Sequence, residues 1–362
     1  MIIAISVILF FLVLRFTVTL FNFISNPKLP RIGTPHQNFV SILIPARNEE
    51  NNILKLLQSI NRQDYINYEV IILDDGSTDN THDLCSDFCA SHPQFSIIKG
   101  GELPAGWLGK NYACYQLAQH AKGQYLLFLD ADEAIEPALL NSAIHRMQLN
   151  KLALLSLFTN QTMITPGEKT VVPMMHFLLL NLLPLRLVYL TRHAAVAAAS
   201  GQFMLFDAEV YRKQQWHQAV QDKVVEDVEI MKKVKASRYR GESLLANGMI
   251  HCRMYTGYLE AITGFSKNFL AIFNYSVFGF LIYIITVIGG PLLILTTLNA
   301  PLIAFMAGLI ILTRIMISLS AGQNALLNVL LHPAQMFSLM LIAFLAIQKY
   351  LTRTTVWKGR KV

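Results

Sequence analysis

Three carboxylates follow a short apolar run in the stretch YLLFLDADEAI, residues 125–135. The mostly apolar residues 125–129 predict a buried strand, and Asp130, Asp132 and Glu133 come directly after it. Crowded carboxylates repel one another and resist ionisation unless a cation lies among them. The stretch therefore raises the question of what these carboxylates hold where the strand ends.

Two further polar clusters stand at the ends of apolar runs, PARNEE at 45–50 and LDDGSTD at 73–79. Each has an ordinary structural explanation, since Asp and Gly dominate turns and acidic residues suit the first turn of a helix. An Asp-x-Asp triplet is also common by chance. Three such clusters in order along the chain, each at a predicted strand end, are more typical of a ligand site.

The middle of the chain alternates between predicted strands and predicted helices. The strands are predicted at residues 39–45, 68–75, 95–99 and 125–129, and the helices at residues 48–60, 79–91 and 110–121. Alternation of this kind predicts a parallel sheet wrapped by helices. Because ligands bind beyond the carboxyl ends of the strands in such sheets, we expect the three polar clusters to meet there.

Both ends of the chain are apolar enough to cross a membrane. Of the 362 residues, 53% are hydrophobic and only 15% are charged. Residues 1–24 contain one charged residue, Arg15, and residues 268–348 contain no Asp, Glu, Lys or Arg except Arg314. Since a crossing takes about 20 apolar residues, the first stretch predicts one uncleaved anchor helix and the second predicts two or three helices.

Basic residues flank the apolar stretches and predict the side that they face. Lys28 and Arg31 follow the first helix, Lys267 precedes the distal block, and a basic tail closes the chain. The positive-inside rule places all of them in the cytoplasm, which requires an even number of distal crossings. Hydropathy offers three candidates, at residues 273–298, 301–321 and 333–348, so either one of them is interfacial or re-entrant or the C-terminus lies outside. The net charge of +7 suits an anionic leaflet and an anionic substrate. The sequence lacks a basic cluster interleaved with aromatic residues, so it does not indicate nucleic-acid binding.

Several segments together resemble the family 2 glycosyltransferases, which have a GT-A fold. They are SILIPARNEE, VIILDDGSTDN, LGKN, FLDADEAIEP and VVEDVEIMKKVK, within residues 38–240. A narrower resemblance is to the membrane-anchored branch that includes bacterial carotenoid glucosyltransferases of the diaponeurosporenoate and hydroxychlorobactene type. It is carried by GWLGKNYA at 106–113, RMY at 253–255 and WKGR at 357–360.

The resemblance implies an α/β protein with a Rossmann-like nucleotide-sugar-binding domain, a mostly parallel sheet, and transmembrane helices at both ends. We expect a transmembrane anchor at 1–24, a cytoplasmic GT-A domain at 37–267, two or three transmembrane helices at 268–350 and a basic cytoplasmic tail at 351–362. Residues 171–190 are apolar but lie between segments that must share one site. We therefore expect an interfacial segment there, interrupted by prolines, where a lipid acceptor enters.

The implied donor is a nucleotide-diphosphate sugar, usually UDP-linked, whose pyrophosphate needs Mg²⁺ or Mn²⁺. Asp132 is the first choice of metal ligand, and Asp130 supports it through the metal's waters or contacts the ribose. Lys110 meets a phosphate as a point charge or is a solvated lysine at a helix start. The resemblance assigns the nucleoside pocket to Pro45, Ala46, Arg47 and Glu49, and contact with the base to Asp75, with Asp74 as a second candidate.

Transfer also needs a base that takes the proton of the acceptor hydroxyl as this oxygen attacks the anomeric carbon. In VVEDVE the position that matches the family's base is Asp227, with Glu226 as its rival and Glu229 facing solvent. A single in-line displacement inverts the anomeric centre. The alternative is that these acids only begin a helix.

Further candidates concern the acceptor. Gly201 and Gln202 fall where related enzymes have an acceptor-side loop, or they are packing residues. Trp107 stacks on a sugar or acceptor, or lies in the core. His251 completes the metal shell or is structural. The QxxRW stretch of processive polysaccharide synthases is absent after the predicted base, which favours addition of a single sugar.

These features predict an integral protein of the cytoplasmic membrane that moves a sugar, with glucose as first choice, from a UDP-sugar to a lipophilic acceptor such as a carotenoid. A glycolipid or polyprenyl-phosphate glycosyltransferase is an alternative within this class. A non-catalytic membrane subunit that binds nucleotide-sugar is an alternative from another class. A transporter is disfavoured because the distal block contains so little charge.

Overall fold

The structure, a computed structural model, describes residues 1–352, 356–357 and 360–361. It divides the chain into two compact units, which we describe separately. The sheet unit comprises Pro27–Asn160 and Leu185–Arg253, and the helical unit comprises Met1–Asn26, Gln161–Pro184 and Met254–Val362. Residues 161–184 and 254–267, which lie within the predicted domain 37–267, thus pack within the helical unit.

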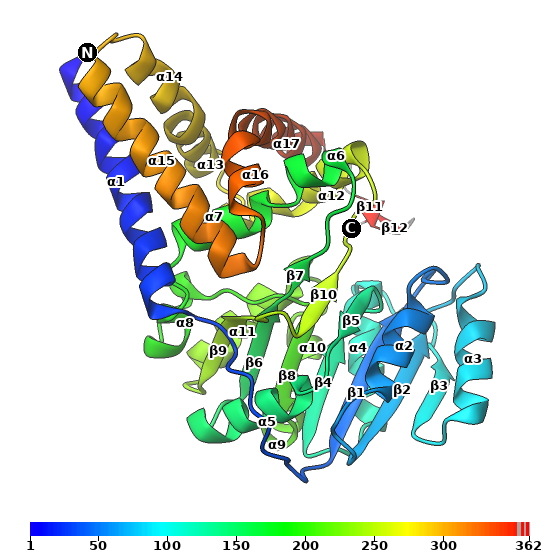
Figure 1. Cartoon of the computed structure of the whole chain (residues 1–362). Helices are drawn as coiled ribbons and strands as arrows, with labels where there is room; N and C mark the ends of the chain where they lie inside the picture. The colour runs from blue at the N-terminus through cyan, green and yellow to red at the C-terminus, as the bar shows by residue number, and fades with distance from the viewer. Residues whose placement is uncertain (353–355, 358–359, 362) are drawn as a thin grey trace. The chain divides into compact units, whose positions relative to one another are not determined.

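A seven-stranded sheet forms the centre of the sheet unit, with strand order β3-β2-β1-β4-β8-β6-β9 (Figure 1). Its strands are β1 (Val40–Ala46), β2 (Tyr68–Asp74), β3 (Phe95–Lys99), β4 (Tyr125–Leu129), β6 (Leu154–Phe158), β8 (Phe203–Asp207) and β9 (Gly241–Leu245). Only β8 runs antiparallel to its two neighbours, β4 and β6. The predicted α/β class with a mostly parallel sheet is therefore confirmed.

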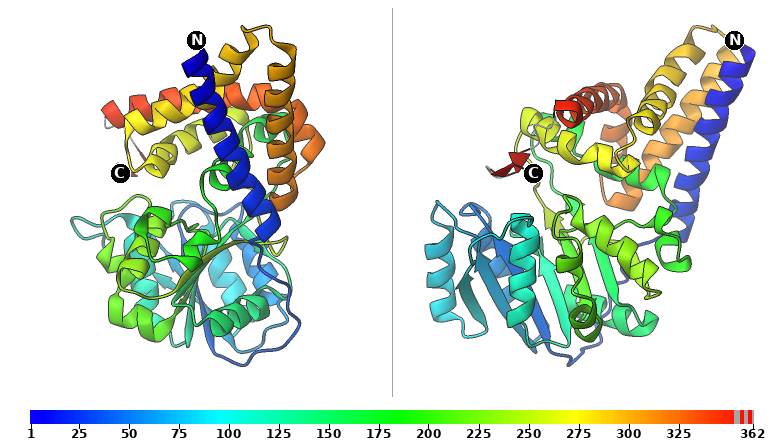
Figure 2. Two further views of the ribbon diagram at one scale, coloured as in Figure 1. Left: turned by 90° about the vertical axis from the view of Figure 1, so that its left-hand side faces the viewer. Right: turned by 180° about the vertical axis from the view of Figure 1, so that it is seen from behind.

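Helices cover both faces of this sheet (Figure 2). Successive strand residues point to opposite faces. Ile42 and Ile44 of β1 therefore share one buried cluster with Leu56 and Leu57 of helix α2 (Ile53–Asn61). The other face of β1 packs against α4 (Gly109–His120). Strands buried on both sides explain why the sequence shows continuous apolar runs here.

The helix predicted at residues 48–60 begins only at Ile53. Asn48 has a left-handed backbone with φ 54°. The amide of Glu50 donates to Asp79 Oδ2 at 3.2 Å, and the Glu50 carboxylate accepts from the amide of Asn80 at 3.2 Å. Side chains that bond neighbouring backbone compete with helix formation, so the acidic residues tie this segment to the loop after β2.

The remaining helices of the sheet unit surround these elements. They are α3 (Thr81–Ser91), α5 (Leu139–Asn150), α8 (Leu187–Leu190), the 3₁₀ turn η1 (Ala194–Val196), α9 (Ala208–Gln214), α10 (Trp216–Ala219) and α11 (Glu226–Ala236). The short strand β7 (Asn160–Gln161) follows β6. A small antiparallel pair, β5 (Glu133–Ile135) and β10 (Ile250–Cys252), brings Cys252 opposite Glu133.

The helical unit contains four helices that are long and apolar enough to cross a membrane. They span Ile2–Ser25, Val277–Leu295, Ala300–Ala321 and His332–Thr352. The first is α1, the second joins α13 (Val277–Ile284), the π-turn η3 (Ile285–Gly289) and α14 (Gly290–Leu295), and the last two are α15 and α17. The long helices α1 and α15 lie side by side (Figures 1 and 2). All three distal segments proposed from hydropathy are therefore helical.

Shorter helices complete this unit: α6 (Pro166–Val171), α7 (Met174–Leu182), α12 (Tyr258–Asn268), the 3₁₀ turn η2 (Phe269–Phe273) and α16 (Ala325–Leu330). The apolar stretch 171–190 is interrupted at Pro173 and again around Pro184, so it forms no helix of membrane-spanning length. The WKGR segment is described only in part: Trp357 ends β11 (Val356–Trp357) and Arg360 begins β12 (Arg360–Lys361), whereas Lys358 and Gly359 lie outside the described residues.

Candidate active site

The antiparallel placement of β8 beside β4 builds the centre of the candidate site. Leu129, the last residue of β4, is paired with Phe203, the first residue of β8. The amide of Asp130 continues this register by donating to the carbonyl oxygen of Gln202 at 3.2 Å. The Asp-x-Asp segment and the small-residue segment before β8 are therefore neighbours, although they lie some 70 positions apart in the chain.

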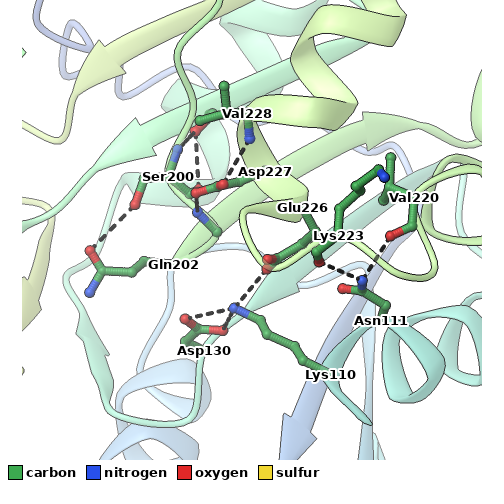
Figure 3. A network of polar contacts seen from close by, with 12 residues as sticks. Lys110, Asn111, Asp130, Ser200, Gln202, Val220, Lys223, Glu226, Asp227 and Val228 are labelled. Atoms are coloured by element: carbon green, nitrogen blue, oxygen red, sulfur yellow. Dashed lines mark hydrogen bonds and ion pairs between the residues drawn. The ribbon is translucent and has the colours of Figure 1, made fainter. Parts of the chain in front are cut away.

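Lys110, in the first turn of α4, links two carboxylates in this centre (Figure 3). Its Nζ lies 2.8 Å from Asp130 Oδ1 and 3.2 Å from Glu226 Oε1. Burial alone would lower the pKa of Lys110, but the two carboxylates outweigh it and hold that pKa well above its usual range. Lys110 is therefore charged, and it neutralises part of the negative charge of both partners.

Asp227 stands in a different environment from its neighbour Glu226. Its Oδ2 accepts from the amide of Gly201 at 2.9 Å and its Oδ1 from the amide of Val228 at 2.7 Å. Among the described residues, no cationic side chain lies within salt-bridge distance of it. Burial and then the charge of Glu226 raise the pKa of Asp227 to about 7, against the lowering by its two hydrogen bonds. Asp227 is therefore the carboxylate of this pair that can take up a proton near neutral pH.

Gly201 permits this close arrangement of charged groups. A Cβ at this position would lie 3.1 Å from both Glu226 Oε1 and Lys110 Nζ. Its amide at the same time orients the Asp227 carboxylate. The residue predicted as an acceptor-side glycine thus touches the predicted base and the predicted phosphate lysine.

A second acidic cluster lies at the other end of the Asp-x-Asp segment. One ligand atom each from Asp132, Glu133 and Cys252 lies within 4.8 Å of the other two. Cys252 Sγ is 3.5 Å from Asp132 Oδ2. Glu133 is 1% exposed, and neither of its carboxylate oxygens has a hydrogen-bond partner within the part of the chain that the structure describes.

The electrostatics of this cluster fit a bound cation. Burial, followed by repulsion from Asp130 and Glu49, raises the pKa of Asp132 to about 6. Burial and the same acidic segment also hold the pKa of Glu133 well above its usual range. A cation among these groups would offset both the repulsion and the lost solvation. Two buried carboxylates supply the oxygen ligands that Mg²⁺ and Mn²⁺ prefer, whereas the thiol of Cys252 is a soft donor that suits other metals.

The sequence predicts Asp132 and Asp130 as metal ligands, with His251 as a candidate to complete the shell, and does not indicate Cys252 as their neighbour. His251 Nε2 lies 3.1 Å from the carbonyl oxygen of Gly248. Because neighbouring strand residues point to opposite faces, the pairing of β10 with β5 turns Cys252 toward Glu133. The alternation of side chains along a strand could have indicated that Cys252 and Glu133 share a face. This inference requires knowing that β10 pairs with β5. Asp130 is engaged by Lys110 and is not part of this cluster.

The residues predicted to form the nucleoside pocket lie together at the carboxyl ends of β1 and β2. The amide of Asp75 donates to the carbonyl oxygen of Ala46 at 2.9 Å, next to Pro45. Arg47 Nη1 donates to the backbone carbonyl oxygens of Asp75 and of Gly76. The guanidinium of Arg47 therefore fixes the turn that carries Asp75.

Asp74 and Glu49 make local contacts beside this pocket. Asp74 Oδ1 accepts from the amide of Ser77 at 3.0 Å, which is the turn-capping role considered from sequence. The amide of Glu49 donates to Thr81 Oγ1 at 2.7 Å, and its carboxylate accepts from Asn52. Both side chains thus stabilise the loops around the carboxyl edge of the sheet.

The two other acceptor candidates are less exposed to a ligand. Gln202 is buried, and its Oε1 accepts from Thr159 Oγ1 at 2.9 Å. The half-buried ring of Trp107 packs against Tyr112 and Tyr115, with ring centroids 5.3 and 5.2 Å apart. The buried Gln202 side chain therefore stabilises the segment before β8, while Trp107 belongs to an aromatic group at the start of α4.

Comparison with known proteins agrees with this geometry. Residues 41–214 match the family model described as Glycosyl transferase family 2. The mannosyltransferase PcManGT from Pyrobaculum calidifontis, solved in complex with GDP-Man and Mn²⁺, superposes with a TM-score of 0.56 at 16% identity, covering 97% of this chain and 100% of that one. The chain therefore has a GT-A-like α/β fold.

Curated relatives carry a more specific name. The 4,4'-diaponeurosporenoate glycosyltransferase of Staphylococcus haemolyticus is 38% identical over 93 residues, which are 26% of this chain and 24% of that protein. The enzyme of the same name from Staphylococcus aureus strain USA300 is 40% identical over 93 residues, with the same coverage of 26% and 24%. The match thus spans about a quarter of the length of these relatives.

Proposed function

We propose that the family 2 glycosyltransferase domain of this chain transfers one sugar, with inversion, from a UDP-sugar to a lipophilic acceptor, in a reaction that depends on Mg²⁺ or Mn²⁺. A carotenoid is the first choice of acceptor, because the similar staphylococcal proteins are named for a carotenoid acid. Glucose is the first choice of sugar, as the resemblance to carotenoid glucosyltransferases implies. A glycolipid or polyprenyl-phosphate acceptor is the alternative.

The contrast between Glu226 and Asp227 is the observation that carries this proposal. Glu226 is paired with Lys110, whereas Asp227 is positioned by two backbone amides and keeps a pKa near neutrality. A general base is most effective when its pKa lies near the working pH. Two adjacent carboxylates with such different environments are typical of a site in which one has an acid–base role and the other has an electrostatic one.

In the proposed reaction the acceptor oxygen attacks the anomeric carbon and its proton passes to Asp227. The new bond joins the acceptor oxygen to the sugar, and the bond between the anomeric carbon and the diphosphate oxygen breaks. The electron pair of the broken bond leaves with the nucleoside diphosphate. Lys110, already charged, supplies fixed positive charge beside Asp130 while charge develops on the leaving group.

Asp132 and Glu133 are the residues that would hold the divalent cation through carboxylate oxygens, with the Cys252 thiol beside them and Asp130 nearby, paired with Lys110. A bound Mg²⁺ or Mn²⁺ would neutralise the diphosphate and stabilise it as a leaving group. The nucleoside is proposed to bind at the edge formed by Pro45, Ala46, Arg47, Glu49 and Asp75, with Asp74 supporting the turn beneath it.

A membrane location is proposed from the four long apolar helices. Large apolar side chains on them are exposed, including Phe10 at 62%, Phe278 at 76% and Phe344 at 67%, which suits contact with lipid. Basic flanks favour a cytoplasmic sheet unit. Labelling single cysteines from outside intact cells should miss positions in 38–267. Position 357 should also be missed if two distal helices cross the membrane, whereas labelling at 357 alone would support three distal crossings. External labelling within 38–267 would contradict this orientation.

The function is tested with the purified full-length protein in detergent. We expect Mn²⁺-dependent release of UDP that requires an added lipid extract, with a hexose mass added to one lipid component in mass spectrometry. A protein that binds UDP-sugar but releases no UDP with any extract would be the non-catalytic subunit. Modification of a polyprenyl phosphate or a glycolipid, with the carotenoid fraction unchanged, would select the alternative acceptor.

A further inference from the structure

Two arginines lie in the helical unit far from any acidic partner. Arg15 belongs to α1 and Arg314 to α15, and both helices are long and apolar enough to span a membrane. The helical unit contains only two acidic residues, Glu168 and Glu260. Within the described residues, neither arginine forms an ion pair with a carboxylate.

Arg314 is 1% exposed and only partly satisfied by neutral groups. One of its terminal nitrogens donates to Gln335 Oε1, and its guanidinium carbon lies 4.9 Å from the centre of the Phe177 ring. Its Nε is buried without a hydrogen-bond partner in the described structure. An amide oxygen and an aromatic face orient the guanidinium but leave its charge uncompensated.

Two more buried nitrogens near this group lack partners. Asn181 Nδ2, on α7, and His332 Nδ1, at the start of α17, have no hydrogen-bond partner among the described residues. Both residues line a cavity of about 20 Å³ together with Arg15 and Phe177. This volume suits a group the size of a water molecule or an oxyanion oxygen.

The arrangement has the chemistry of an anion site. Buried polar groups are normally hydrogen-bonded, so the two orphaned nitrogens that line this mainly apolar cavity need an explanation, as does the Nε of Arg314 nearby. Cationic and neutral nitrogens converge there, and an oxyanion would satisfy them and balance the arginine charge at once. Water would satisfy the hydrogen bonds but would leave the charge uncompensated.

We propose that this cavity receives one oxygen of the phosphate group of an anionic lipid, held by Arg15, Asn181 and His332, while Arg314, which stacks on the cavity-lining Phe177, adds positive charge beside it. The cavity lies among helices proposed to cross the membrane, so a lipid reaches it along the bilayer while its acyl chains remain against the exposed apolar helix surfaces. The site is separate from the candidate active site, and the inference does not depend on the proposed glycosyl transfer.

The test measures thermal stability and lipid retention of the full-length protein in a neutral detergent, with no sugar donor present. Phosphatidylglycerol, phosphatidylcholine and inorganic phosphate are titrated separately, and retained lipids are counted by native mass spectrometry. We expect phosphatidylglycerol alone to raise the melting temperature and to remain bound as one copy. A charge-assisted hydrogen bond is worth about tenfold or more in affinity, so Arg15→Gln should weaken this effect by about that factor.

Arg15 is the variant of choice because, within the described structure, its side chain bonds the Phe11 carbonyl of its own helix and otherwise interacts with the hydroxyl of Tyr283, so its loss should not disturb folding. Lys349→Gln is the matched control, since it removes the same charge from the same unit where Lys349 contacts Ser266 and Thr263 instead. An equal response of both variants would overturn the proposal. So would equal stabilisation by phosphatidylcholine. Stabilisation by inorganic phosphate without retained lipid would overturn the lipid assignment.

Discussion

Asp227→Asn separates proton transfer from substrate binding in the proposed reaction. Asparagine keeps the shape and can still accept from the amide of Gly201, which donates to Asp227 at 2.9 Å, but it is not a base. General-base catalysis contributes roughly 10²–10⁴-fold, or about 2.7–5.4 kcal/mol of activation free energy. We therefore expect turnover to fall by about that factor, measured as UDP release with saturating donor and Mn²⁺.

The pH profile gives this prediction a second readout. A base acts in its deprotonated form, so activity should rise with pH through the pKa of Asp227, which is about 7. The ionised fraction of such a group is about 0.1 at pH 6 and about 0.9 at pH 8. Turnover should accordingly increase about tenfold between these values in the wild type, and this step should be absent in Asp227→Asn.

Glu226→Gln is the matched control in the adjacent position. Its charge helps to raise the pKa of Asp227, so removing it should move the midpoint of the pH profile to lower values and reduce turnover only mildly. Donor affinity, measured as UDP-sugar binding with Mn²⁺, should change little in Asp227→Asn. If Glu226→Gln is inactive and Asp227→Asn turns over normally, the base has been assigned to the wrong carboxylate.

Three further changes probe the surroundings of this centre. Asp132→Asn should leave the melting temperature unchanged while Mn²⁺ binding by calorimetry weakens at least tenfold, and unchanged binding would place the ion elsewhere. Gly201→Ala should reduce turnover without loss of secondary structure, because its methyl group would lie 3.1 Å from Lys110 Nζ; Gly33→Ala, in open space, is the control. Glu242→Gln breaks an ion pair in which Arg146 makes two hydrogen bonds, of 2.5 and 2.7 Å, to the carboxylate. The free energy of unfolding should fall by roughly 3 kcal/mol. An unchanged free energy of unfolding in chemical denaturation would refute this prediction.

The sheet was largely predictable because its local signals agree. Strands buried on both faces appear as continuous apolar runs, and the predicted strand 125–129 has the same bounds in the structure. The helix predicted from Asn48 was wrong at its start because Glu50 bonds to residues of the loop after β2. Helix-start signals describe one segment, whereas that contact joins two segments about 30 positions apart.

Residue types and local spacing are sufficient to predict the apolar helices, the α/β alternation and the acidic segments at the strand ends. Contacts between distant segments, by contrast, determine which groups meet. The antiparallel strand β8 brings Gly201 to Asp227 and Lys110, and the β5–β10 pair turns Cys252 toward Glu133. The different environments of Glu226 and Asp227 arise from these long-range contacts, because a carboxylate's proton affinity depends on its burial and on the charges around it.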